Sequence, residues 1–330
     1  MRILITGANG LLGNNIARLA QDRGLSIASI SRSDGANRAF RGMDIEVFPV
    51  NLVDRRRLAT VFENQFDVVI HCAASIHIGW KFVEQGMQVN RDGTQYLLEE
   101  AGKRGIKFIH VSTVNTLPVG TRDLIVDEET KGGGQILCNY VVTKMAAERL
   151  AVAAAAAGQD VVIVHPGFMV GPWDWKPSSG RMLQALQGFA PVSPSGGCTV
   201  CDPRDVAEAI LNAIDRGVSG RHYILGGENM MYLDLWRRIC EALGKKGPLT
   251  YMRSPGRILA GTIGDVISRF TKQELDINSA AIRISSQIQW FSSQRAITEL
   301  GYKPRPAIDS IRDAVAWLRE NNLLKVPVHG

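Results

Sequence analysis

The 330-residue sequence lacks any apolar run near the ~18 residues of a membrane-spanning helix, so we expect no membrane span. It opens directly on "RILIT", and no positively charged segment followed by an apolar one precedes this run, so we expect no signal peptide. Cysteines number only five, an odd count, and a reducing cytoplasm is the location that fits best.

A complete zinc-binding pattern is missing as well. Cys198 and Cys201 form a CxxC pair, a pattern that suits redox chemistry or a metal, but no second CxxC or histidine pair completes a zinc site. We therefore interpret both residues as free structural thiols and expect no metal site.

Clustered positive charge is missing as well, although the formal net charge is +6 and the pI is about 9.1. The 38 Lys and Arg residues are scattered among 32 Asp and Glu residues. Only residues 55–57 form a run of arginines, which we interpret as the solvated start of a helix. A nucleic-acid footprint needs a clustered patch, so we expect no nucleic-acid partner.

The first half of the chain alternates short β-branched runs with amphipathic helical stretches. Its apolar runs show little polar alternation, which is typical of strands covered by helices on both faces. This pattern predicts an α/β fold with a Rossmann-type, doubly wound parallel sheet. The expected strands are 2–6, 26–31, 45–50, 67–74, 107–113 and 160–166, and the expected helices are 11–24, 53–64, 86–104 and 138–157.

The sequence changes character after Pro166, where loop-like stretches and short strands such as 221–227 interrupt the helices. We predict a nucleotide-binding domain at 1–167, to which segments near 198–226 return, and a smaller substrate-binding lobe at 168–330. A packed helix is expected at 307–321. Large apolar residues of the lobe suit either a pocket or the core, namely Trp173, Trp175, Phe189, Met230, Met231 and Tyr232.

A glycine-rich loop, "TGANGLLG", joins the first expected strand to the first expected helix. Glycine permits a tight turn and a close approach of the diphosphate, and the helix N-terminus offers free N–H groups with a positive dipole end. This context, strand before and helix after, predicts a dinucleotide site. The residues expected to bind the cofactor here are Gly7, Asn9, Gly10, Leu11, Leu12 and Gly13.

The end of the second expected strand bears on which dinucleotide is bound. NAD sites usually carry an acid there for the ribose hydroxyls, whereas NADP needs a cation for its 2′-phosphate. Arg32 directly follows Ser31, and the nearest acid, Asp34, comes two positions later. We therefore predict NADP(H), with Arg32 as a ligand, and keep NAD as the alternative in which Arg32 is a surface charge.

The stretch "NYVVTK" places Tyr140 four positions before Lys144, the spacing that brings two side chains together on one helix face. Taken alone the pair is weak evidence, because short motifs arise by chance. The order of the surrounding motifs is far more specific, since "TGANGLLG" is followed by "HCAA", "VST" and then "YVVTK".

In this order of motifs the chain resembles the extended short-chain dehydrogenase/reductase superfamily over nearly its whole length. It is most similar to dihydroflavonol-4-reductase-like proteins and to the bacterial branch often labelled hopanoid-associated sugar epimerase. The stretches that carry this finer resemblance are "GPWDWKPSSGR", "CDPRDVAEA", "HYILGGEN" and "ELGYKPRPAIDSIRDAVAWL".

The resemblance implies a catalytic role for three residues. Tyr140 would be the general acid or base, and Lys144 would stabilise the phenolate of Tyr140 and hold the nicotinamide ribose. Thr113 would hydrogen-bond the substrate oxygen. Ser112 is the weaker candidate, because adjacent strand residues face opposite sides.

The resemblance also implies further cofactor contacts. Ala73 and Ala74 would line the adenosine path, Asn90 would support the central strands, and Pro166 and Val170 would flank the nicotinamide. Asn51, with Leu52 beside it, stands where relatives usually have an aspartate that contacts adenine. His71 is interpreted as a hydrogen-bonded histidine at a strand end, because Tyr140 already transfers the proton.

Two positions depart from the relatives that act on nucleotide sugars. Phe168 stands where they commonly have Asn, and His165 stands in place of their Arg. We therefore predict a cytoplasmic NADP(H)-dependent oxidoreductase that interconverts a carbonyl and an alcohol on a small hydrophobic substrate. The alternatives are an NAD-dependent nucleotide-sugar epimerase or dehydratase and a non-catalytic dinucleotide-sensing protein. A homodimer is common in this superfamily and is an open expectation here.

Overall fold

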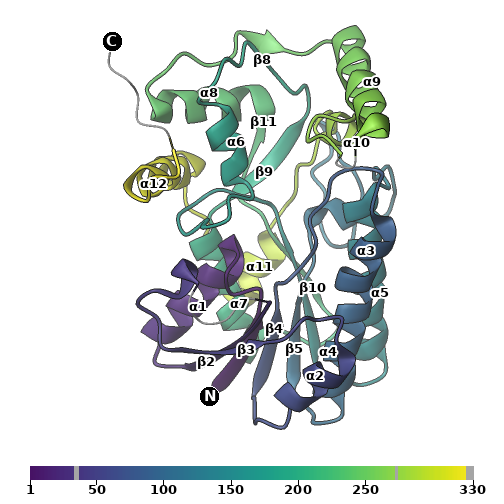
Figure 1. The fold of residues 1–330 in the computed structure, drawn as a ribbon, viewed down its shortest axis with the longest axis vertical. Coiled ribbons are helices and arrows are strands. Elements are labelled where there is room, and N and C mark those ends of the chain that lie inside the picture. Colours follow the sequence, from purple (N-terminus) through teal and green to yellow (C-terminus); the bar gives the residue numbers. More distant parts are fainter. Residues whose placement is uncertain (33–36, 272–273, 325–330) are drawn as a thin grey trace.

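A computed structural model of the chain describes residues 1–32, 37–271 and 274–324. Its main element is a parallel sheet with the strand order β10-β6-β5-β4-β1-β2-β3, drawn in the lower half of Figure 1. The chain leaves β1 for β2 in one direction and later returns to β4 on the other side. Ligands of doubly wound sheets bind at such a reversal, at the carboxyl ends of the strands.

The elements of the first part follow the alternating pattern in the sequence. The strands are β1 (Arg2–Thr6), β2 (Ser26–Ser31), β3 (Ile45–Pro49), β4 (Val68–His71), β5 (Lys107–Val111) and β6 (Val161–Pro166). The helices are α1 (Leu11–Asp22), α2 (Arg55–Val61), α3 (Val83–Met87), α4 (Gly93–Gly102) and α5 (Asn139–Ala156). Single turns are η1 (Arg38–Phe40), η2 (Gln88–Asp92) and η3 (Val114–Thr116).

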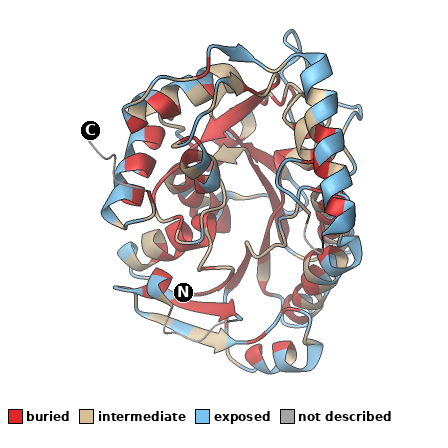
Figure 2. Ribbon diagram, turned by 45° about the horizontal axis from the view of Figure 1, so that its top comes forward, coloured by how far each residue is buried: buried red, intermediate tan, exposed pale blue. Residues whose placement is uncertain are grey.

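Helices cover both faces of this sheet, which explains why its strands are apolar on both sides. One hydrophobic cluster joins the sheet to α1 and to α7 (Pro203–Arg216), and a second joins it to α2, α4 and α5. Figure 2 shows the inner strands of the sheet almost entirely buried and the outer helix faces exposed, whereas the edge strand β3 is intermediate to exposed. This burial is the main source of stability, at roughly 25 cal/mol per Å² of apolar surface.

The second lobe lies above the carboxyl ends of the large sheet (Figure 1). Its strands are β7 (Phe168–Met169), β8 (Val192–Ser193), β9 (Gly197–Cys201), β11 (Glu228–Met231) and β12 (Thr250–Tyr251). Its helices are α6 (Gly180–Ala185), α8 (Tyr232–Leu243), α9 (Ser254–Phe270), α10 (Ser279–Ile284) and α12 (Ala307–Glu320). A third cluster, which includes Trp317 and Met230, forms the core of this lobe.

Two late segments rejoin the large sheet. β10 (His222–Leu225) pairs with β6, and α11 (Gln294–Leu300) packs against α7 and β10. The boundary expected at residue 167 stays a prediction. Among the described residues no helix is both long and apolar enough to cross a bilayer.

Candidate active site

The glycine-rich loop turns sharply between β1 and α1. Gly7 has φ +73°, and a Cβ there would lie 2.9 Å from the backbone of Ala73. A Cβ on Gly13 would lie 2.3 Å from the Gly7 carbonyl oxygen. Gly10 is the N-cap of α1 and has no side chain to cap the helix. A Cβ on Gly10 would lie 3.4 Å from the Gly7 carbonyl oxygen, in ordinary contact. The loop thus leaves the N-terminal amides of α1 uncovered, as a dinucleotide diphosphate requires.

The neighbouring side chains of this loop fall into two groups. Leu11 and Leu12 are buried, and their side chains pack inward. Asn9 donates a hydrogen bond from Nδ2 to the Ser31 hydroxyl at 3.3 Å, which ties the loop to the end of β2. Arg32 follows and is exposed, whereas Asp34 lies outside the described residues. These residues therefore fit a dinucleotide, and Arg32 stands directly after the end of β2, while its contact with a 2′-phosphate stays a prediction.

Thr113 and Tyr140 meet at the carboxyl end of β5. Thr113 caps η3, and its hydroxyl is hydrogen-bonded to the half-buried side chain of Tyr140. Tyr140 lies in the first turn of α5, where its backbone N–H donates to the His77 carbonyl at 3.1 Å. Ser112 points away and donates to Glu148, which agrees with the opposite facing of adjacent strand residues.

Lys144 follows Tyr140 by one helical turn and is almost fully buried. Its ammonium donates to the Val111 carbonyl oxygen at 2.7 Å. Burial lowers the pKa of Lys144 to about 8, and Glu148 opposes this shift. The charge of the ammonium also acts on His71 and Cys72, at the end of β4, and lowers the pKa of each.

The pKa of Tyr140 is raised, because burial disfavours the phenolate more than the hydrogen bond from Thr113 favours it. Lys144 was expected to lower this pKa, but the shift is set by burial, is opposed by the hydrogen bond with Thr113, and has no contribution from Lys144 among its causes. In this state Tyr140 is a protonated group, suited to donate a proton rather than to accept one.

Three residues behind Thr113 form a polar chain that the sequence argument missed. Glu148 accepts a hydrogen bond from Thr116 at 2.7 Å, and His165 Nδ1 lies 3.2 Å from the Thr113 carbonyl oxygen. A carbonyl only accepts, so Nδ1 of His165 carries the proton and Nε2 accepts from His222 Nδ1 at 2.9 Å. The spacing Tyr140, Lys144, Glu148, four residues apart each time, was the available signal.

Acids and histidines in this arrangement are also potential metal ligands. The donor atoms of Glu148, His165 and His222 all lie within 4.8 Å of one another. However, the two rings stack at 5.1 Å and share a hydrogen bond, and Glu148 is bound by hydroxyl groups. The donors are therefore engaged with each other, and the cluster fixes the backbone of Thr113.

A second chain holds the Thr113 hydroxyl from the other side. Asn115 approaches Thr113 Oγ1 through its backbone N–H at 3.3 Å and its Nδ2 at 3.2 Å. Gln289, far along the sequence, donates to Asn115 Oδ1 at 2.8 Å. Asn115 was visible two residues after Thr113 in the sequence, but no local pattern pointed to Gln289.

The remaining expected residues lie at the carboxyl edge of the sheet or in the core. His71 is hydrogen-bonded at both nitrogens, to Thr6 at 2.7 Å and to Thr94 at 2.9 Å, as predicted. Asn90 binds the backbone of Ser75 and the hydroxyl of Thr143, which joins the chain after β4 to α5. The others are Ala73 and Ala74 just after β4, Pro166 ending β6, exposed Asn51, buried Leu52, and Val170 in the core of the second lobe.

The five cysteines are all free. Burial raises the pKa of Cys198 to about 12, and that of Cys201 is raised for the same reason, so both are protonated thiols. The structure therefore agrees with the interpretation of this CxxC pair as structural.

Buried histidines make the stability of the fold dependent on pH. Burial lowers the pKa of His71 to about 3 and that of His222 to about 4, and it lowers the pKa of His110 well below its usual range. The unfolded chain binds these protons near pH 6.5 and the folded chain does not, so stability falls as pH drops below 6.5. Each such histidine contributes up to about 1.4 kcal/mol per pH unit.

We therefore expect His110→Leu to flatten this pH dependence. Neither ring nitrogen of His110 has a hydrogen-bond partner among the described residues, so the substitution removes no contact of that kind. Urea unfolding at pH 7.5, 6 and 5 should show that the variant gains stability over the wild type as pH falls. Parallel stability curves for the two proteins would contradict this expectation.

Comparisons with known proteins agree with this fold. Residues 3–226 match the NAD dependent epimerase/dehydratase family, so the chain belongs to that family, within the extended short-chain dehydrogenase/reductase superfamily. It is an NAD(P)-dependent oxidoreductase of this extended type, which sets aside the alternative of a non-catalytic sensor.

Individual relatives cover nearly the whole chain. Sterol demethylase protein B of Methylococcus capsulatus is 29% identical, over 98% of this chain and 100% of that protein. A putative dihydroflavonol 4-reductase of Synechocystis is 27% identical, over 97% and 95%. The crystal structure of gox2253 superposes with a TM-score of 0.83 at 30% identity, covering 98% of this chain and 99% of that one.

Proposed function

We propose that this enzyme is an NADP(H)-dependent oxidoreductase that interconverts a carbonyl and an alcohol on a small hydrophobic substrate. The observation that carries the proposal is the hydrogen-bonded pair of Thr113 and Tyr140. Lys144 lies one turn away, and the glycine-rich loop lies at the end of β1 in the same sheet. When bound, the dinucleotide supplies or accepts the hydride.

The residues of the chain provide the proton and the positioning. In the direction of reduction, protonated Tyr140 donates its proton to the carbonyl oxygen, and Thr113 hydrogen-bonds the same oxygen. The buried ammonium of Lys144 stabilises the phenolate that is left behind, and solvent returns the proton. The raised pKa of Tyr140 keeps the phenol protonated before the hydride arrives, and the loss of its proton then depends on the charge of Lys144.

The surroundings of Tyr140 support an apolar substrate. Its ring packs against a small cluster that contains Val141 of α5 and Ala280 and Ile284 of α10. His165, at the position where nucleotide-sugar relatives have Arg, is fully buried and bonded to His222, so it offers no cation to a diphosphate. Two relatives are named as enzymes of sterols and of dihydroflavonols, and both of these are ring compounds with a hydrophobic skeleton.

A substrate panel tests this proposal. We expect NADPH oxidation with hydrophobic cyclic or lipid-like carbonyl compounds, followed by absorbance, and no detectable binding of UDP- or dTDP-sugars at millimolar concentration. An NDP-sugar needs cations and amide donors to replace the hydration of its phosphates. Calorimetry that showed micromolar binding of a UDP-sugar would favour the nucleotide-sugar epimerase instead.

The cofactor preference rests on Arg32. We expect NADPH to bind more tightly than NADH, and Arg32→Ala to weaken NADPH by roughly 1.5–3 kcal/mol, the scale of a charge-assisted hydrogen bond. NADH should be almost unaffected, because it lacks the 2′-phosphate. Fluorescence titration measures both cofactors, and Arg41→Ala, another exposed arginine nearby in sequence, is the control. Equal wild-type affinities for the two cofactors would refute the preference.

A further inference from the structure

Helix α9 exposes its large apolar side chains rather than burying them. Phe270 is 87% exposed, Ile258 68% and Leu259 61%. The outward face also includes Ile263, Val266 and Ile267. At about 100° per residue these positions form one continuous half of the helix surface. An exposed apolar patch of this kind marks an interaction surface.

The opposite face of α9 is made of small residues that press against the protein. Gly261, Gly264 and Ser268 are its buried positions. A Cβ on Gly264 would lie 1.9 Å from the carbonyl oxygen of Ile277, so no larger residue fits there. The helix is therefore held in a fixed rotation, with its large apolar residues toward the outside.

Two further large apolar side chains of the second lobe are exposed. β12 directly precedes α9 in the chain and pairs with β8. Leu249, 83% exposed, stands at the start of β12, and Phe189, 94% exposed, precedes β8. Phe189 was expected either in a pocket or in the core, and it lies in neither, because its side chain is exposed to solvent.

Positive charge accompanies this surface. Arg253 and Arg269, at the two ends of α9, are exposed. Arg257 and Arg283 line a cavity of about 460 Å³ between α9 and α10. Of the nearby acids, Asp265 accepts a hydrogen bond from the backbone N–H of Ser279 at 3.0 Å, and Asp276, which is exposed, forms an ion pair of 3.4 Å with Arg181.

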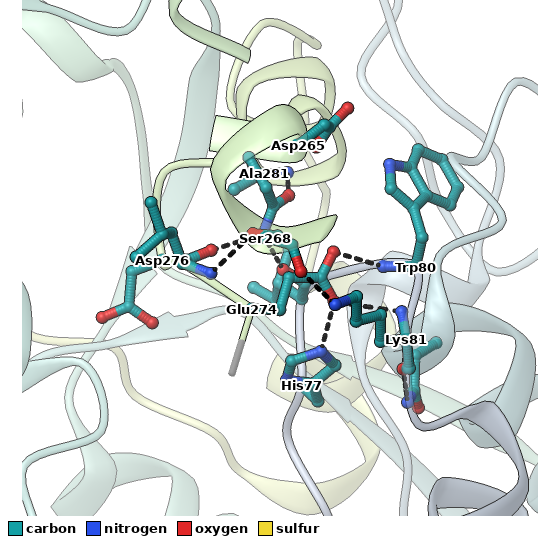
Figure 3. A network of polar contacts seen from close by, with 12 residues as sticks. His77, Trp80, Lys81, Asp265, Ser268, Glu274, Asp276 and Ala281 are labelled. Carbon is teal, nitrogen blue, oxygen red and sulfur yellow. Dashed lines mark hydrogen bonds and ion pairs between the residues drawn. The ribbon is translucent and has the colours of Figure 1, made fainter. Parts of the chain in front are cut away.

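A polar network fastens this surface to the catalytic helix (Figure 3). Glu274, just after α9, accepts hydrogen bonds from His77 Nε2 at 2.7 Å and from the backbone N–H groups of Trp80 and Lys81. The carbonyl groups of the loop that contains His77, Trp80 and Lys81 accept hydrogen bonds from the backbone N–H groups at the start of α5, including that of Tyr140. The α9 surface and the active site are thus parts of one connected structure.

We propose that α9 docks this enzyme on the surface of an anionic lipid bilayer. The 17 residues of α9 span only about 25 Å, so the helix lies in the plane of the interface with its apolar face among the acyl chains. Arg253 and Arg269 contact lipid phosphates at the helix ends. An apolar face flanked by cations, beside acids that already have partners among the described residues, is what favours a lipid surface over a second copy of the chain.

Vesicle co-sedimentation tests the proposal without requiring a substrate or activity, so its failure is distinct from failure of the proposed oxidoreductase. The full chain is mixed with phosphatidylcholine vesicles, or with vesicles that contain about a quarter phosphatidylglycerol. The test variant is the double substitution Ile263→Glu, Phe270→Glu. The control is Val218→Glu, Ile297→Glu, which changes two exposed apolar residues away from α9.

We expect binding to the anionic vesicles, a loss of about tenfold or more in the α9 variant, and none in the control. Light scattering measures the oligomeric state of the wild type and both variants in the absence of lipid. The proposal is overturned if the wild type does not sediment with anionic vesicles, or if the α9 variant binds as well as the control. A wild-type dimer that the α9 substitutions convert to a monomer also overturns it, because the face would then be covered by a second copy.

Discussion

Tyr140→Phe is expected to lower turnover by about 10² to 10⁴ while cofactor affinity stays nearly unchanged. The substitution removes the hydroxyl that is hydrogen-bonded to Thr113, and with it the only proton that this pair is positioned to give to a carbonyl oxygen. The ring is retained, so its packing against α10 persists. Single-turnover kinetics with NADPH separate the chemical step from cofactor binding.

Tyr96→Phe provides the matched control for this experiment. Tyr96 is also partly buried, but it lies on α4 beneath the Arg55 guanidinium, away from the strand ends. Its variant should keep full activity. Thr113→Val should also slow turnover, and the double variant with Tyr140→Phe should be little worse than either alone, because the two hydroxyls act on one oxygen. Unchanged turnover in Tyr140→Phe would exclude the residue as the acid.

Lys144→Met is expected to separate stability from activity. Burial lowers the pKa of Lys144 from its usual 10.5 to about 8. A shift of this size means that burying the charged ammonium costs a few kcal/mol at pH 7. Methionine removes this cost but leaves the Val111 carbonyl without its donor, so we expect a net gain of about 1–2 kcal/mol in unfolding free energy. Turnover and cofactor affinity should both fall, since the ammonium is proposed to hold the ribose and stabilise the phenolate.

The pH dependence gives this prediction a second readout. The folded wild type binds fewer protons than the unfolded chain between about pH 8 and 10.5, so its own stability rises across that window. The advantage of the methionine variant should therefore be largest below pH 8 and shrink above it. Lys103→Met, which changes the exposed lysine directly after α4, is the control. A variant that loses stability at pH 7 and keeps its activity would contradict both roles.

Regular elements of the nucleotide-binding part could be predicted closely from the sequence. The strands predicted at 2–6 and 26–31 match the observed strands to the residue, because a buried parallel strand appears in the sequence as a short local run of mostly apolar residues. The Tyr140–Lys144 spacing likewise depends on one helix alone. Asn115 and Gln289 could not be predicted as a pair, because their contact joins segments 174 positions apart. The same is true of His165 and His222, which meet only when β10 pairs with β6.

The two polar chains around Thr113 also bear on how the enzyme is made. The ribosome synthesises β5 and α5 early. His222, which holds the Thr113 carbonyl through His165, and Gln289, which holds the Thr113 hydroxyl through Asn115, are synthesised later, because both belong to the last third of the chain. A nascent chain that already holds the glycine-rich loop therefore has Thr113, the residue proposed to bind the substrate oxygen, without its supports. If Thr113 has this role, we expect competence for hydride transfer only in the nearly finished polypeptide, after the nucleotide-binding strands have formed.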